Sequence, residues 1–179
     1  SLMEILTNPN EDAKVFLGAV ILQQDDTTQQ SSDSKEFIVI DGQQRLTTIF
    51  LTVFALYEHA VEQGYDDIAE NLKLRYLLSQ GFKTKGMPKL FLTNLDLNQF
   101  NSILKGAGFK YVASVGKSRG AEKGHLTTAY KYIKEEIVGA LIEQWQNDYD
   151  KEPRAAFDLL RDTFLEKVVM ADITLNNNE

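Results

Sequence analysis

The chain has 179 residues and no cysteine, which excludes disulfides, thiolate nucleophiles and cysteine-ligated zinc. Its 26 acidic residues outnumber 19 basic ones and give a formal net charge of −7, which disfavours bulk binding of duplex DNA, because domains that hold DNA through phosphates are usually basic. No run of about 18 apolar residues is present, so we expect no membrane partner and a cytoplasmic location.

Two β-rich segments joined by a polar run stand near the start of the chain. The stretch "VFLGAVILQQ" predicts a strand from Leu17 to Gln23, and "EFIVID" predicts a second strand that ends at Asp41. The intervening run, which begins "DDTTQQSSDS", predicts a disordered loop over residues 25–35. A hairpin is the simplest pairing of these two strands.

The hydrophobic period changes from strand to helix at Gln43. Apolar residues at three-and-four spacing predict a helix that ends near Gly64 and is buried on most sides. Later patterns predict helices over 66–78, 95–104 and 126–147, another from Pro153, a short strand over 89–93 and a closing strand in "KVVMADITL". We therefore expect an α+β fold with a small mixed sheet, a core over 15–93 and a mainly helical extension over 94–179.

The junction between the second strand and the first helix is unusually polar, "DGQQRLTT". A helix that starts directly after Gly42 presents free N–H groups and a favourable dipole to an anion. Arg45 in the first turn offers a guanidinium that can grip phosphate with two donors. Thr47 and Thr48 lie within reach of the same turn. This spacing is compatible with a phosphate site.

Plain helix capping explains the same residues. Asp41 is a good N-cap, and Asp41 with Gln44 approximates a capping box. Spacing alone favours the cap. A carboxylate at Asp41 would also repel phosphate unless a divalent cation bridged the two, so phosphate together with Mg²⁺ uses these residues better than phosphate alone.

The stretch "VIDGQQRLTT" resembles the signature of the N-terminal domain of GmrSD-type, modification-dependent (type IV) restriction endonucleases, a domain similar to the ParB/sulfiredoxin fold. The likeness extends to "VFLGAVIL", to "KLFLTNLDLNQFNSIL" and to "HLTTAYKYIKEEI". It implies that the domain binds and hydrolyses an NTP, so we expect an NTP with Mg²⁺ as the cofactor. It also implies that the nucleotide site is coupled to restriction of modified or foreign DNA.

The resemblance also implies roles for individual residues. The catalytic candidates are Asp41, Gln43, Gln44 and Arg45, with Asp41 also a possible Mg²⁺ ligand. The nucleotide-binding candidates are Gly42, Gln43, Gln44, Arg45, Thr47 and Thr48. The family's preceding proline–glutamine–arginine segment and its following His-Asn-His nuclease are not found in 1–179. We therefore expect a single fragment of a larger protein, which meets DNA through the full-length chain or a partner nuclease domain.

Two other functions stay open from the sequence. The domain could be a non-catalytic module that senses nucleotide or contacts proteins, with the junction acting only as a helix start. Less strongly indicated is direct DNA contact through the glycine-rich loop 105–124, which carries the basic residues Lys110, Lys117, Arg119 and Lys123.

Overall fold

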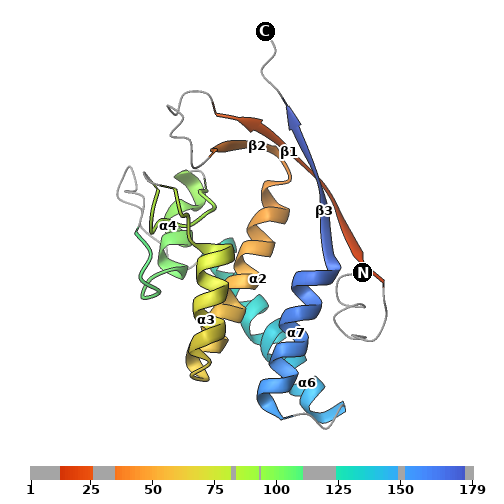
Figure 1. The fold of residues 1–179 in the computed structure, drawn as a ribbon. Coiled ribbons are helices and arrows are strands. Elements are labelled where there is room, and N and C mark those ends of the chain that lie inside the picture. The colour runs from red at the N-terminus through yellow and green to blue at the C-terminus, as the bar shows by residue number, and fades with distance from the viewer. Residues whose placement is uncertain are drawn as a thin grey trace.

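The computed structural model describes residues 13–25, 35–81, 84–92, 94–110, 124–148 and 152–175. Within these ranges the chain forms a small mixed sheet at one end of a helical body, with helices leading into and out of the sheet (Figure 1). The predicted α+β class is confirmed.

The sheet of the described residues has three strands in the order β2-β1-β3. Strand β1, Val15–Gln24, lies in the centre and pairs antiparallel with β2, Phe37–Asp41, so the predicted hairpin is confirmed. Strand β3, Val168–Leu175, is the predicted closing strand and pairs parallel with β1. The sheet thus takes strands from both predicted regions, 15–93 and 94–179. Of the predicted loop 25–35, residues 26–34 lie outside the described ranges.

Helix α2, Gln43–Glu62, begins directly after the sheet and runs through the centre of the helical body (Figure 1). Every residue from Phe50 to Tyr57 is buried. The prediction that this helix is buried on most sides is confirmed.

The remaining helices surround α2. They are α3 (Asp66–Leu72), α4 (Asn94–Ile103), α5 (His125–Tyr132), α6 (Ala140–Asp148) and α7 (Pro153–Lys167), with the π-helical segments η1 (Lys73–Leu77) and η2 (Ile133–Gly139). Segment η1 continues α3, and η2 joins α5 to α6, so the predicted long helices over 66–78 and 126–147 are confirmed with wider turns inside them. None of the described helices has the length and apolarity that a membrane crossing requires.

The predicted strand over 89–93 is wrong where the structure describes it. Residues 89–92 form no strand, and the nearby pairing is a single bridge between Leu78 and Pro88. The N–H of Lys89 donates to the carbonyl of Leu77, and the side chains of Leu90 and Leu92 pack on the core. The segment has β-type side chains but no neighbouring strand among the described residues, and apparent β propensity depends on such a partner.

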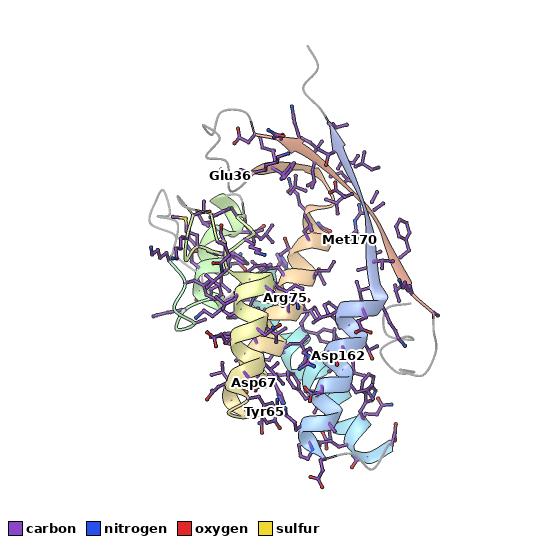
Figure 2. All side chains as sticks on the ribbon, in the orientation of Figure 1. Glu36, Tyr65, Asp67, Arg75, Asp162 and Met170 are labelled. Atoms are coloured by element: carbon purple, nitrogen blue, oxygen red, sulfur yellow. The ribbon has the colours of Figure 1, made fainter. Side chains whose placement is uncertain are left out.

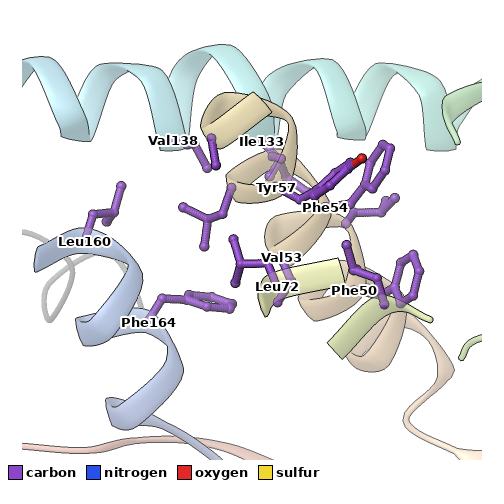
Figure 3. Close-up of a cluster of buried hydrophobic side chains, with 14 of the residues drawn as sticks. Phe50, Val53, Phe54, Tyr57, Leu72, Ile133, Val138, Leu160 and Phe164 are labelled. Atoms are coloured by element: carbon purple, nitrogen blue, oxygen red, sulfur yellow. The ribbon is translucent and has the colours of Figure 1, made fainter. Parts of the chain in front are cut away.

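The hydrophobic core lies where α2 meets α3, η2 and α7. Figure 3 shows Phe50, Val53 and Tyr57 of α2 among side chains from these other elements, with Phe164 of α7 on one side and Ile133 of η2 on another. The largest side chains that are almost completely buried include Trp145, Phe54, Phe100 and Phe157. The core therefore fixes α2, and with it the place where the sheet meets the helices.

A cluster of polar and charged side chains connects the last turns of α2 to α5 and η2. The Oη of Tyr130 donates to Oε2 of Glu58 over 2.5 Å, and Nζ of Lys134 lies 2.8 Å from Oε2 of Glu58 and from Oε1 of Glu62. Burial, then the bond to Glu58, raises the pKa of Tyr130. Burial lowers the pKa of Lys134, but its bonds to Glu58 and Glu62 outweigh burial and raise it overall. Both shifts keep the protonated forms that these contacts need.

His59 makes the stability of the α2–α7 contact depend on pH. Its ring lies 5.0 Å from the ring of Phe157, and burial, with a further contribution from Lys134, lowers the pKa of His59 despite the opposing field of Glu62. The unfolded chain therefore takes up a proton at His59 more readily than the folded chain does. The contribution of neutral His59 to the free energy of unfolding is complete above about pH 6.5 and is lost as the pH falls toward the lower pKa of the folded state. We expect the free energy of unfolding to fall on acidification through this window.

Urea unfolding followed at several pH values between 5 and 8 measures this dependence. His59→Gln is expected to flatten the acidic slope, whereas His125→Gln, which replaces the exposed histidine at the start of α5, is expected to leave it in place. An unchanged slope in His59→Gln would contradict the assignment.

Candidate functional site

The polar junction lies where β2 passes into α2. Strand β2 ends at Asp41, Gly42 adopts φ +91°, and α2 begins at Gln43. Gly42 is buried, and a Cβ built on it would lie 3.0 Å from Cγ2 and 3.2 Å from Cα of Val20 in β1. Only glycine combines this left-handed conformation with so close an approach.

The predicted capping by Asp41 is wrong. The N-cap residue is Gly42, and within the described part of the chain no side-chain hydrogen bond caps α2. The carboxylate of Asp41 turns instead to Arg45, whose Nη2 lies 3.0 Å from Oδ2. A residue one position before the N-cap cannot reach the first-turn amides in the way that an N-cap side chain does, and an arginine four residues later competes for its charge.

Arg45 is held by two contacts from different strands. Nη1 donates to the carbonyl oxygen of Ala19 in β1 over 2.7 Å, and Nη2 donates to Asp41 of β2. A guanidinium has five N–H donors, so three are left after these two bonds. With its side chain 36% exposed, Arg45 is oriented by the protein and still open to solvent.

The backbone amides of the first turn of α2 add further donors. The N–H of Leu46 makes the first bond within the helix, to the carbonyl of Gly42. The N–H groups of residues 43–45 precede this bond, as at any helix start. Together with the dipole of a 20-residue helix and the cation of Arg45, they favour an anion beside the first turn.

The four remaining candidate residues of the junction differ in whether their side chains already make hydrogen bonds within the domain. Thr47 Oγ1 donates to the carbonyl of Gln43 over 2.8 Å, and Thr48 Oγ1 donates to that of Gln44 over 2.9 Å. Each hydroxyl has one proton to donate, so both are used within the helix. Gln43 Nε2 donates to the carbonyl of Val39 over 3.0 Å. Gln44 is exposed, and no hydrogen bond of its side chain is found within the described ranges.

The contribution of β1 to the junction was not predicted from the sequence. Strand β1 pairs Phe16 with Val169 and Ala19 with Ala171, so Leu17 and Gly18 bulge opposite the single Met170. Gly18 has φ +99° and lies directly against the guanidinium of Arg45. A glycine inside an otherwise apolar strand pattern is a signal for a bulge or a close approach, and "VFLGAVIL" contains that signal.

Comparison with family models finds a match over residues 1–179 to the N-terminal domain of the GmrSD restriction endonuclease. The chain belongs to this family. It is therefore a domain of a restriction system, and the resemblance seen in "DGQQRLTT" is confirmed at the level of the family. Comparison with curated proteins and comparison with solved structures gave no match.

The GmrSD domain's predicted DNA-contacting residues fall mostly outside the described ranges. Lys117, Arg119 and Lys123 are among them. Lys110 is exposed, and its N–H donates to the carbonyl of Gly86, over which the lysine side chain also lies. Contact between this loop and nucleic acid stays a prediction.

Asp41 is the one predicted metal ligand of the junction. Within the described ranges, no group of three or more His, Asp or Glu residues could hold a metal ion. The Asp41 carboxylate is 62% exposed and its Oδ1 is not used by Arg45. One free carboxylate oxygen suits Mg²⁺, which commonly takes one or two carboxylates and fills its shell with phosphate and water.

A hollow lies between α3, η1 and α7, away from the junction. It has a volume of about 500 Å³ and is lined mainly by polar and charged residues, among them Asp67, Arg75 and Asp162 (Figure 2). Arg161, which also lines it, is already paired with Asp158 and Asp162. No residue of the junction lines this hollow, so it does not enlarge the site at Arg45.

Proposed function

We propose that this GmrSD N-terminal domain binds an NTP with Mg²⁺ at the β2–Gly42–α2 junction and hydrolyses it within a modification-dependent DNA restriction system. The observation that carries the proposal is the placement of Arg45. Its guanidinium is fixed by the Ala19 carbonyl and the Asp41 carboxylate beside the first turn of α2, and it keeps three donors for a ligand.

The chain's own groups supply most of what a triphosphate requires. The first-turn amides and the helix dipole stabilise phosphate oxygens, and the delocalised charge of Arg45 stabilises the charge that develops during phosphoryl transfer. Bound Mg²⁺ would supply further neutralisation of that charge, held in part by the free oxygen of Asp41. The ion pair with Arg45 keeps this carboxylate turned toward the junction.

Gln44 is the better candidate to orient the attacking water. Gln43 spends its Nε2 on the carbonyl of Val39, whereas the side chain of Gln44 is exposed and makes no such bond among the described residues. A carboxamide that presents both a donor and an acceptor can align a water molecule for attack. We assign Gln43 to the support of the turn and Gln44 to the water.

We propose that the restriction system as a whole binds DNA. Because the domain is acidic overall, we assign the main DNA contacts to the full-length protein or to a partner nuclease domain. Direct contact through the loop 105–124 is the weaker variant.

A non-catalytic sensing module is the second candidate. The donor protons of Thr47 and Thr48 and two of the N–H groups of Arg45 are all used inside the domain. A site arranged in this way could bind nucleotide without hydrolysing it. A protein partner would then respond to whether the site is occupied. Binding without hydrolysis in the complete protein would favour this candidate.

Arg45→Ala is expected to weaken the nucleotide response strongly. A lost charged hydrogen bond weakens binding by roughly tenfold to a hundredfold, so the thermal shift produced by ATP, GTP, CTP or UTP with MgCl₂ should become much smaller at a nucleotide concentration about ten times the wild-type Kd. Calorimetric titration of the complete protein, with and without Mg²⁺, gives the affinities. No response of the wild type to any of the four nucleotides would overturn the proposal.

Arg154→Ala is the matched control. Arg154 also forms an ion pair with an aspartate, Asp67, and is 44% exposed, but it lies at the start of α7. Its replacement should leave nucleotide affinity unchanged. Gln44→Ala separates the two candidates, because it should keep affinity and abolish phosphate release only if the domain is an NTPase.

A further inference from the structure

Strand β1 takes part in the junction through Gly18. In the bulge opposite Met170, Gly18 has a left-handed φ of +99°. A Cβ built on this residue would lie 2.5 Å from Nη1 and 3.6 Å from Cζ of Arg45, and apart from Gly18 and its chain neighbours no other atom of the described residues lies within 4 Å of it. The space that a Cβ of residue 18 would need is therefore occupied by the guanidinium of Arg45.

The same bulge provides the bond that orients the guanidinium. The next residue, Ala19, accepts the hydrogen bond from Nη1 of Arg45 over 2.7 Å. A side chain at position 18 would occupy the place from which Nη1 makes that bond. Because Nη1 is the far end of a flexible side chain, the clash would be relieved by movement of Arg45 rather than of the backbone.

From this geometry we infer that Gly18 is a positioning residue for nucleotide binding, which acts by leaving room for the Arg45 guanidinium over β1. The inference rests on the proposed function of the junction. It adds a residue 27 positions before Arg45, on a strand for which the sequence suggested only a structural role. Any side chain larger than hydrogen at Gly18 separates Arg45 from the Ala19 carbonyl, and the anion site then loses its fixed cation.

Gly18→Ala in the complete protein tests the inference against Gly106→Ala. Gly106 has nearly the same φ, +94°, but no atom of the described residues beyond its chain neighbours lies within 4 Å of a built Cβ, so its alanine variant carries the conformational cost without the clash. Calorimetric titration with the NTP that binds the wild type, in the presence of MgCl₂, should show affinity about tenfold or more weaker for Gly18→Ala and unchanged for Gly106→Ala. Equal affinities of the two variants would overturn the inference.

A double-mutant cycle for stability shows whether Gly18 acts through Arg45, and it does not need a ligand. Gly18→Ala should lower the urea midpoint more in the wild-type background than in Arg45→Ala, which lacks the guanidinium that clashes with the added Cβ. If Gly18→Ala folds only in the Arg45→Ala background, the inference is supported. Equal losses in both backgrounds, or failure to fold in both, would overturn it, because the cost would then come from the backbone of β1.

The two experiments separate this inference from the proposed function. A wild type that binds no NTP removes the nucleotide role of Arg45 and of Gly18 together. A wild type that binds NTP, with Gly18→Ala as good as Gly106→Ala, keeps the proposed function and removes only the role of Gly18.

Discussion

Phe54→Ala is expected to lower the free energy of unfolding by about 3–5 kcal/mol, the usual cost of deleting a buried phenylalanine. Phe54 has no exposed surface, and its ring centroid lies 5.7 Å from that of Tyr130 in α5 and 6.0 Å from that of Phe109 after α4. One side chain of α2 thus joins two other parts of the helical body. Domains of this kind have only about 5–15 kcal/mol of stability in total, so urea unfolding at 25 °C should show a much earlier midpoint.

Val61→Ala is the control for this prediction on the same helix. Val61 is 49% exposed, and a substitution on such a surface usually changes stability by less than about 0.5 kcal/mol. If Phe54→Ala cost no more than Val61→Ala, the centre of the core would lie elsewhere.

The sequence predicted the helical elements well because their signal is local. In α2 the apolar residues recur at the helical period over twenty positions, and their excess on the other faces correctly indicated burial on most sides. The hairpin and the closing strand were also predicted, since β-branched runs bounded by polar residues are distinctive. The strand over 89–93 failed because pairing depends on a partner that the local sequence does not specify.

The candidate site was predicted only in part, because its geometry depends on contacts between distant residues. The sequence placed Arg45 and Gly42 at a helix start, which the structure shows. It could not show that Asp41 would bond to Arg45 rather than cap the helix, since the two arrangements use the same residues. It also did not indicate the Ala19 carbonyl, because nothing in the pattern of β1 distinguishes the acceptor from its neighbours.

Helix α2 joins the hydrophobic core to the three-stranded sheet. The core fixes one part of this helix, between Phe50 and Ala60, and β1 fixes the other end through Gly42 and Arg45. Loss of the bond between Arg45 and Ala19 would therefore weaken the attachment of the sheet to α2 without disturbing the core. The sheet contributes few buried side chains, with Val20 the one buried residue of β1, so its attachment depends on the contacts at Gly42 and Arg45.

Gly42→Ala is expected to destabilise the domain by about 2–5 kcal/mol. Left-handed φ costs an alanine about 1–2 kcal/mol, and the added Cβ would press on the backbone Cα as well as the Cγ2 of Val20, for which overpacking adds about 1–3 kcal/mol. Unlike the clash at Gly18, this one cannot be relieved by a flexible side chain, so α2 must move away from β1. Urea unfolding of the variant measures the loss.

The same displacement should also reduce nucleotide affinity, because it carries Arg45 away from the Ala19 carbonyl. Gly106→Ala again provides the comparison, since it introduces only the strain of a left-handed alanine. Its loss of about 1–2 kcal/mol in the free energy of unfolding should be clearly smaller than the loss in Gly42→Ala. Equal costs would mean that β1 yields to the new methyl group and that the junction is not held against the sheet. A larger cost with nucleotide affinity intact would separate the two roles of the junction, leaving Gly42 to fold stability and the anion site to the first turn of α2 alone.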